Sequence, residues 1–182
     1  GYLKSYADYS TNMMQSGMPY TYGDKCNPYD SVYASSMSEA EKSDLVIMFG
    51  NSPADTRMGG ANIVYDFAKV RESVTGRGGK IVNIDYRLNE TSSGHPDEWL
   101  PIRTGTDAAL VNAIAHELIA NDQVDKGFLD EYCVGYDEDT MPESAKGQSK
   151  SYKDYIMGTG YDKVEKTPAW AASITKVPAE RI

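Results

Sequence analysis

Two short polar stretches follow apolar runs in the sequence and carry side chains suited to binding a phosphate or a sugar. They are Gly50-Asn51-Ser52 with Thr56, and Asp85 with Arg87. A glycine lets a ligand approach the backbone closely, and an arginine binds phosphate through two parallel hydrogen bonds. If the ligand holds guanine, Asp85 can accept hydrogen bonds from both N1–H and the 2-amino group, a pair of donors that adenine lacks.

A third polar stretch, 103–107, leads directly into a predicted helix. Backbone N–H groups at the start of a helix attract an anion, Gly105 gives the anion room, and Arg103 adds positive charge. Asp107 is the predicted N-cap of this helix. On spacing alone, the three stretches fit a nucleotide site and fit plain structural loops about equally well.

Other kinds of functional site are not indicated by the sequence. It contains no GxGxxG, no GxxxxGK[ST] and no GxSxG motif, and no two of its carboxylates can be paired into an acid–base dyad. Cys26 and Cys133 lie far apart and form no CxxC motif, and His95 and His116 do not have metal-ligand spacing. We therefore expect no metal cluster, and two free thiols are favoured over the alternative of a single disulfide.

The composition indicates a globular domain with an acidic surface. The chain has 182 residues, 40% of them hydrophobic, and a net charge of -9. Because a nucleic-acid phosphate backbone needs clustered lysines and arginines, we expect no nucleic-acid partner. No run of 18 apolar residues and no signal peptide is visible in the sequence.

The apolar pattern predicts an α/β fold: a Rossmann-like, open, mainly parallel sheet with flanking helices. Continuous apolar runs predict two strands buried on both faces, and helical spacing predicts two long helices. In chain order the expected elements are a strand at 45–49, a helix at 61–74, a strand at 80–85, an extended piece at 99–102 and a helix at 107–120.

We interpret the chain as three segments. Residues 1–42 form an irregular, Tyr-rich N-terminal segment that ends in a helical turn at 37–42. Residues 43–134 form the nucleotide-binding α/β domain, with a further short helix at 123–132. Residues 135–182 form a polar excursion and a returning helix at 167–174 of the same domain, with Thr167 as its cap.

The ends of the chain favour an internal fragment of a longer protein, with a frayed tail as the alternative. The sequence starts at Gly1 without a methionine, and its last residues, 177–182, resemble the start of a helix.

Several segments, in order along nearly the whole chain, resemble the molybdopterin oxidoreductase family, and within it the catalytic subunits of the dimethyl sulfoxide reductase type. The most specific are LVIMFGNSPADTRMGG (45–60), KIVNIDYRLNETSS (80–93) and DEWLPIRTGTDAALVNAIAHELI (97–119). Weaker matches lie at 1–3, 8–10, 128–142 and 167–182. Two positions depart from the family pattern, because Tyr86 and Thr104 stand where many members have proline.

The resemblance implies a bis(molybdopterin guanine dinucleotide) molybdenum cofactor, one of whose two dinucleotides is held by this domain. Carried over by position, Gly50, Asn51 and Ser52 line the pyrophosphate with Thr56 nearby. Asp85 and Arg87 sit at the guanosine end, and Arg103, Gly105 and Asp107 complete the pocket. The ligands of the molybdenum and of a 4Fe-4S cluster are expected upstream of Gly1, so the isolated chain is expected to be inactive.

For the full-length parent, the resemblance implies an oxidoreductase that reduces S-oxides or N-oxides with electrons from a quinol. Its expected partners are the remaining domains of the same subunit, an iron–sulfur electron-transfer subunit and a membrane anchor subunit. The parent is expected to lie peripherally on the bacterial cytoplasmic membrane, with an upstream twin-arginine signal. The alternatives are a stand-alone nucleotide-binding module with a regulatory role and an interaction domain that binds no nucleotide.

Overall fold

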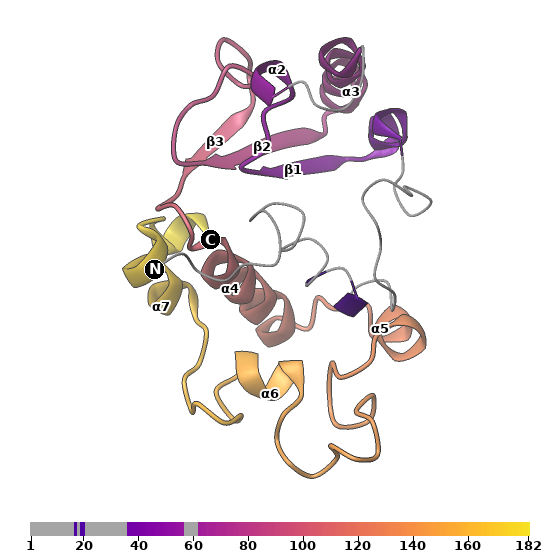
Figure 1. The fold of residues 1–182 in the computed structure, drawn as a ribbon, viewed down its shortest axis with the longest axis vertical. Helices are drawn as coiled ribbons and strands as arrows, with labels where there is room; N and C mark the ends of the chain where they lie inside the picture. Colours follow the sequence, from indigo (N-terminus) through magenta and orange to yellow (C-terminus); the bar gives the residue numbers. More distant parts are fainter. Residues whose placement is uncertain (1–16, 18, 21–35, 57–61) are drawn as a thin grey trace, which may run out of the picture.

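The structure, a computed structural model, describes residues 17, 19–20, 36–56 and 62–182. At its centre is a three-stranded sheet with the order β1 (Leu45–Phe49), β2 (Lys80–Asp85), β3 (Glu98–Pro101) (Figure 1). Both strand pairs are parallel, with Phe49 opposite Ile84 and Asp85 opposite Pro101. The carboxyl ends of all three strands therefore lie at one edge of the sheet.

One face of the sheet packs against α3 (Ile63–Gly76), which connects β1 to β2. The core on this side is formed by Met48, Phe67, Val70, Val74 and Ile81. A 3-10 helix, η1 (Met37–Lys42), adds Met37 and Ala40 to the rim of this core. The predicted helical turn at 37–42 and the strand–helix–strand unit are thus confirmed.

The opposite face is covered by α4 (Asp107–Ala120), α7 (Pro168–Thr175) and η2 (Ala179–Arg181). Its core consists of Ile84, Leu100, Ile102, Leu110 and Val177. The Thr167 hydroxyl accepts a hydrogen bond from the N–H of Trp170 and so caps α7, as predicted. Helices on both faces confirm the expected α/β class of fold.

The segment between α4 and α7 is mainly irregular and lies on the far side of α4 from the sheet (Figure 1). It includes α5 (Lys126–Tyr132), capped by Asp125, and α6 (Tyr152–Ile156), capped by Ser151. His116 connects α4 to this segment, because its Nε2 lies 2.8 Å from Oε1 of Glu165. Its Nδ1 lies 3.0 Å from Oε1 of Glu117, the next residue of α4. None of the helices in the described residues is both long enough and apolar enough to cross a bilayer.

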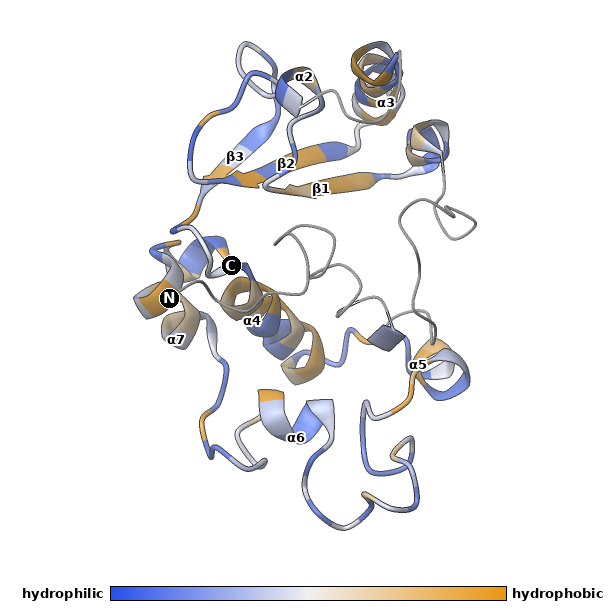
Figure 2. Cartoon of the chain, in the orientation of Figure 1, coloured by the Kyte–Doolittle hydropathy of each residue, from blue (hydrophilic) through white to orange (hydrophobic). Residues whose placement is uncertain are grey.

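Two predictions about these elements are wrong. β1 is not buried on both faces, because it is an edge strand of which α3 covers only the side of Met48. On the other side Leu45, Ile47 and Phe49 are 52%, 43% and 40% exposed, although Figure 2 shows β1 as strongly apolar. The N-cap of α4 is Thr106 rather than Asp107, which is the first residue within the helix.

Candidate nucleotide-binding site

The loop after β1 turns sharply at Gly50. This residue has φ +56°, in the left-handed region that glycine adopts without strain, and its N–H donates to the carbonyl of Ile84 at 2.9 Å. A Cβ at Gly50 would meet no atom within 4 Å, so the turn leaves open space beside the backbone. The chain then enters α2 (Pro53–Thr56) with Asn51 exposed and Ser52 buried.

Ser52 connects this loop to the loop after β2. Its Oγ donates to Oδ2 of Asp55 at 2.5 Å and lies 2.7 Å from Oγ1 of Thr91. Because a serine has a single hydroxyl proton, Thr91 must be the donor in the second bond. The Thr91 hydroxyl in turn accepts from the N–H of Ala54 at 3.0 Å, and the Thr56 hydroxyl donates to the carbonyl of Ser52 at 3.0 Å.

Asp85, the last residue of β2, is 6% exposed and is held by Asn89. The Asn89 amide donates to Oδ2 of Asp85 at 2.8 Å. Among the described residues, the other carboxylate oxygen, Oδ1, has one long contact, of 3.5 Å from the N–H of Arg87. The Asp85 carbonyl accepts from Nε1 of Trp99 at 3.1 Å. The carboxylate is therefore fixed in place by one oxygen, while the other keeps most of its capacity to accept a hydrogen bond.

Arg87 joins the same network from the surface. Its guanidinium lies 3.1 Å from Oδ2 of Asp55, and its side chain is 48% exposed. The charge of Asp55 raises the pKa of Arg87. In return, the Ser52 hydrogen bond and the charge of Arg87 hold the pKa of Asp55 below its ordinary value, against the opposing effect of desolvation. Arg87 thus stays cationic beside the ends of β1 and β2.

A buried ion pair that the sequence reasoning missed lies behind these loops. Arg71 of α3 forms a two-pronged contact with Asp97, with Nε–Oδ1 and Nη2–Oδ2 distances of 3.0 and 2.7 Å. Its Nη2 also donates to the carbonyl of Thr91 at 2.6 Å. Asp97 accepts from the Ser92 hydroxyl, which accepts from the buried amide of Asn83. This chain of contacts fixes the position of the loop from 89 to 92.

A sequence signal for Arg71 did exist. It stands four residues after Phe67 and three before Val74, so it lies on the apolar stripe of the helix. Its guanidinium lies 4.9 Å from the centroid of the Phe67 ring. An arginine on the buried face of a helix indicates a buried partner, but the sequence alone does not identify that partner as Asp97.

The third predicted stretch borders the same edge but is anchored elsewhere. Ile102 donates to the carbonyl of Asp85 at 3.3 Å, and the N–H of Arg103 donates to the carbonyl of Thr175 in α7 at 2.8 Å. Gly105 has φ +75° and open space beside it, and both Arg103 and Gly105 are exposed. The first residue of this loop, Ile102, is therefore bonded to the end of β2, whereas Arg103 is bonded to α7.

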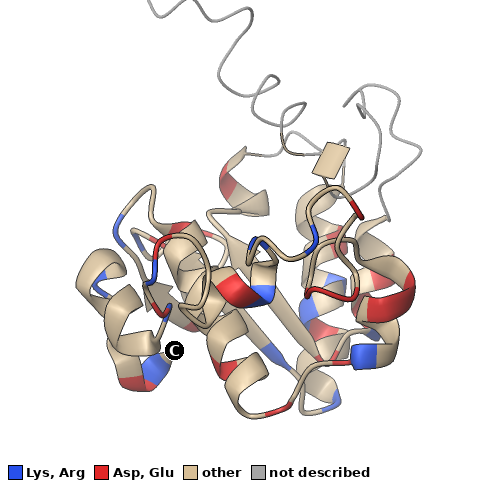
Figure 3. Cartoon of the chain, turned by 90° about the horizontal axis from the view of Figure 1, so that it is seen from below, with Lys and Arg blue, Asp and Glu red and all other residues tan. Residues whose placement is uncertain are grey.

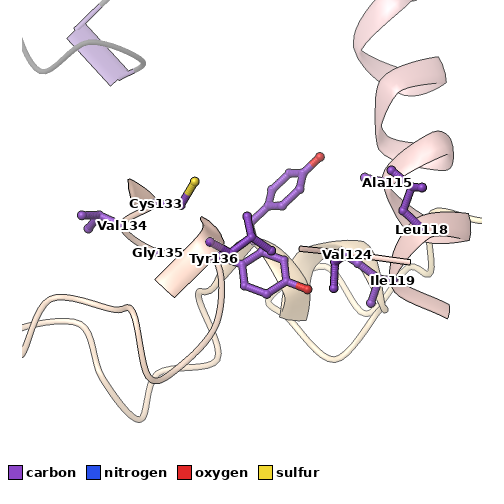
Figure 4. Close-up of a pocket in the computed structure, with 10 residues that line it drawn as sticks. Ala115, Leu118, Ile119, Val124, Cys133, Val134, Gly135 and Tyr136 are labelled. Atoms are coloured by element: carbon purple, nitrogen blue, oxygen red, sulfur yellow. The ribbon is translucent and has the colours of Figure 1, made fainter. Parts of the chain in front are cut away.

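The structure also contains a hollow of about 370 Å³ on the other side of α4, between that helix and α5 (Figure 4). Its walls include Leu118, Ile119 and Val124, with Tyr136 and Tyr152. None of its lining residues carries a formal charge at pH 7, so it offers a phosphate no cationic side chain. The acidic and basic residues in Figure 3 are interspersed along the helices and loops rather than gathered in one patch. The strand-end edge is the better candidate site.

Comparison with known proteins decides the family. Residues 1–179 match the family described as molybdopterin oxidoreductase. The chain belongs to this family. It is 47% identical over its whole length to "Dimethyl sulfoxide reductase DmsA" of Haemophilus influenzae, and 32% identical over its whole length to a trimethylamine-N-oxide reductase of Vibrio parahaemolyticus. It covers 22% and 21% of these two relatives, so it spans about a fifth of their length.

A solved structure supports the fold alone. The acetylene hydratase of Pelobacter acetylenicus superposes with a TM-score of 0.52 at 24% sequence identity, over 75% of this chain and 15% of that chain. The expected family and the expected parallel α/β architecture are both confirmed. The division into segments and the assignment of individual site residues stay predictions, and Cys26 lies outside the described residues.

Proposed function

We propose that the edge formed by the ends of β1, β2 and β3 binds one guanine dinucleotide of a molybdopterin cofactor, within the catalytic subunit of a dimethyl sulfoxide reductase-like enzyme. The observation that carries this proposal is the buried network from Ser52 through Thr91 and Asn89 to Asp85. It fixes a carboxylate and a guanidinium at the carboxyl edge of a parallel sheet, where ligands of such sheets bind.

The residues present fit a nucleotide. Gly50 and Gly105 leave open space beside the backbone, as close approach of a pyrophosphate requires. Arg87 and Arg103 are exposed cations, and the backbone N–H groups that begin α4 add positive potential next to Arg103. Oδ1 of Asp85 can accept from the N1–H of a guanine. Acceptors for a base, cations for phosphates and room for both are therefore present at one edge.

Each residue has a defined role in this proposal. Gly50, Asn51 and Ser52 line the pyrophosphate, and Thr56 supports that loop through its bond to the Ser52 carbonyl. Asp85 selects guanine, while Arg87 neutralises the nearest phosphate. Arg103, Gly105 and Asp107 close the pocket from the side of α4. The fourteen-residue α4 is long enough to present a developed dipole to the anion.

For the whole protein, we propose an oxidoreductase that reduces S-oxides or N-oxides, as the names of the two relatives indicate for those proteins. When bound, the bis(molybdopterin guanine dinucleotide) molybdenum supplies the oxygen-atom and electron transfer, while the residues of this chain bind and orient it. A 4Fe-4S cluster held by other parts of the parent, an iron–sulfur subunit, a membrane anchor subunit and a quinol would supply electrons. The parent would lie on the cytoplasmic membrane after twin-arginine export.

The test of the nucleotide site is calorimetric titration of the 182-residue chain with GDP, with ADP as the matched control. We expect GDP to bind and ADP to bind more weakly, because N1 of adenine carries no hydrogen that could be donated to Oδ1 of Asp85. The variant Asp85→Asn should bring the two affinities together while the melting temperature stays close to that of the unchanged chain. Equal affinities for GDP and ADP in the unchanged chain would contradict the assignment of Asp85.

A further inference from the structure

The loop from Asp85 to Asn89 is held by hydrogen bonds at its two ends, and the residues between them are exposed. The Asn89 amide closes it onto Asp85 at 2.8 Å, and Oδ1 of Asn89 accepts from the N–H groups of Thr91 and Ser92 at 3.2 and 3.3 Å. Asn89 is 0% exposed and Asp85 is 6% exposed, whereas Tyr86 between them is 62% exposed. A short loop held by buried hydrogen bonds thus holds a large aromatic side chain in solvent.

Tyr86 lies beside the polar part of the edge. Its hydroxyl is one of the groups that raise the pKa of Arg87, after the charge of Asp55, so it lies near that guanidinium. Arg87 in turn lies 3.1 Å from Oδ2 of Asp55. Tyr86 therefore stands close to the cation that would meet a phosphate. Because more than half of Tyr86 is exposed, the ring contributes little to the core, and its surface remains accessible to a ligand.

We infer that Tyr86 is the residue on which the base of the bound nucleotide stacks, an inference that rests on the nucleotide site proposed above. A base whose hydrogen-bonding edge meets Asp85 would lie beside the next residue of the loop, the exposed Tyr86, whose ring offers a surface for its flat face. Stacking on an aromatic ring does not distinguish between bases, because every base has a π-face. Asp85 therefore sets the preference for guanine, while Tyr86 sets the affinity for any base.

This division of roles predicts separate effects on separate ligands. Replacing Tyr86 with alanine should weaken GDP and ADP binding by the same factor, roughly tenfold or more, given the usual strength of stacking on an aromatic side chain. Ribose 5-phosphate, which has no base, should bind the variant as it binds the unchanged chain. Tyr86→Phe keeps the ring and should restore the affinity for both nucleotides, which a role of the hydroxyl alone would not explain.

The experiment titrates the unchanged chain, Tyr86→Ala, Tyr86→Phe and Tyr132→Ala with GDP, ADP and ribose 5-phosphate. Tyr132 is the matched control, because it is 66% exposed at the end of α5, away from the sheet (Figure 1). An equal loss for GDP and ADP in Tyr86→Ala, with recovery in Tyr86→Phe and no change in Tyr132→Ala, is the expected result.

Two other outcomes overturn different claims. If the unchanged chain binds GDP and Tyr86→Ala binds it equally well, the role of Tyr86 is wrong and the proposed nucleotide site stands. If the unchanged chain binds no GDP, the proposed site in this chain is wrong, and the role of Tyr86 is wrong with it. A loss of ribose 5-phosphate binding in Tyr86→Ala also contradicts base stacking, because that ligand offers nothing to stack.

Discussion

The loops after β1 and β2 and the loop after β3 border the same edge of the sheet but are held in different ways. Hydrogen bonds join the first two directly, because the Thr91 hydroxyl contacts both the Ser52 hydroxyl and the N–H of Ala54. The loop after β2 is also closed on itself by the bond from Asn89 to Asp85. The third loop is tied to α7 by the Arg103 N–H, and its only side-chain bond is that of the Thr106 hydroxyl to the Arg103 carbonyl at 2.6 Å, within the described residues.

The difference teaches which part of the edge is preorganised. The carboxylate of Asp85 is buried and held by Asn89 before any ligand arrives, so binding need not order it, and Arg87 is already paired with Asp55. Arg103 is exposed, so its side chain would lose conformational entropy when a ligand binds. A nucleotide that contacts all three loops would bind to ordered loops after β1 and β2 and to a less ordered loop after β3. Most of the ordering on binding should therefore occur in the loop after β3.

The largest expected effect comes from breaking the ion pair behind the rigid loops. The side chains of Asp97 and Arg71 are 0% and 12% exposed, so Arg71→Met leaves a buried carboxylate without its partner. We expect a loss of about 3–5 kcal/mol in the free energy of unfolding, measured by urea denaturation. Lys69→Met, which breaks an exposed pair with Glu72 on the same helix, should leave the midpoint unchanged. Similar midpoints for both variants would contradict the network.

A matched pair of threonine variants compares the two kinds of loop directly. Thr91→Val removes the buried hydroxyl that accepts from the N–H of Ala54 and contacts the Ser52 hydroxyl. The loss should lower the free energy of unfolding by about 1–3 kcal/mol. Thr106→Val removes one bond that water can replace, and should cost less than about 1 kcal/mol. The comparison fails if Thr106→Val destabilises the chain as much as Thr91→Val does.

The rigid loops should weaken in acid. The pKa of Asp55 is lowered, first by the Ser52 hydrogen bond and then by Arg87, from an ordinary value of 3.8. Its contribution to stability is therefore complete above that value and is lost as the pH falls through the lower, folded pKa. Urea denaturation below pH 4 should show a smaller pH dependence for Asp55→Asn than for the unchanged chain. An identical pH dependence of stability in both proteins would show that the contacts of Asp55 with Ser52 and Arg87 do not lower its pKa.

The α4 layer should respond in the opposite direction. Burial lowers the pKa of His116, but hydrogen bonds to Glu165 and Glu117 outweigh it and raise that pKa above 6.5. The stabilisation is complete below that ordinary value and is lost as the pH rises through the folded pKa. His116→Gln should therefore be less destabilised than the unchanged chain by a rise from neutral to alkaline pH. Proton NMR of the imidazole, with exposed His95 as the second signal, gives an independent measurement.

The sequence predicted the periodic elements well. The helix at 107–120 and the strand at 80–85 match α4 and β2, because apolar spacing reports burial directly. It was wrong about β1, because a continuous apolar run does not reveal whether a strand lies at the edge of a sheet. It missed Arg71 with Asp97, a pair 26 residues apart that only the packing of α3 brings together. Hydrogen bonds and ion pairs between residues far apart in the chain produce no periodic pattern in the sequence.

The most direct test of the central claim is an NMR titration of backbone amides in the labelled 182-residue chain with GDP. The account predicts shifts at all three strand ends, around Gly50–Ser52, Asp85–Asn89 and Arg103–Asp107, with the largest gain in hydrogen-exchange protection in the third loop. ADP should shift the amides near Asp85 less at the same concentration. Shifts confined to the apolar hollow between α4 and α5, or no shifts at the strand ends with saturating GDP, would contradict it.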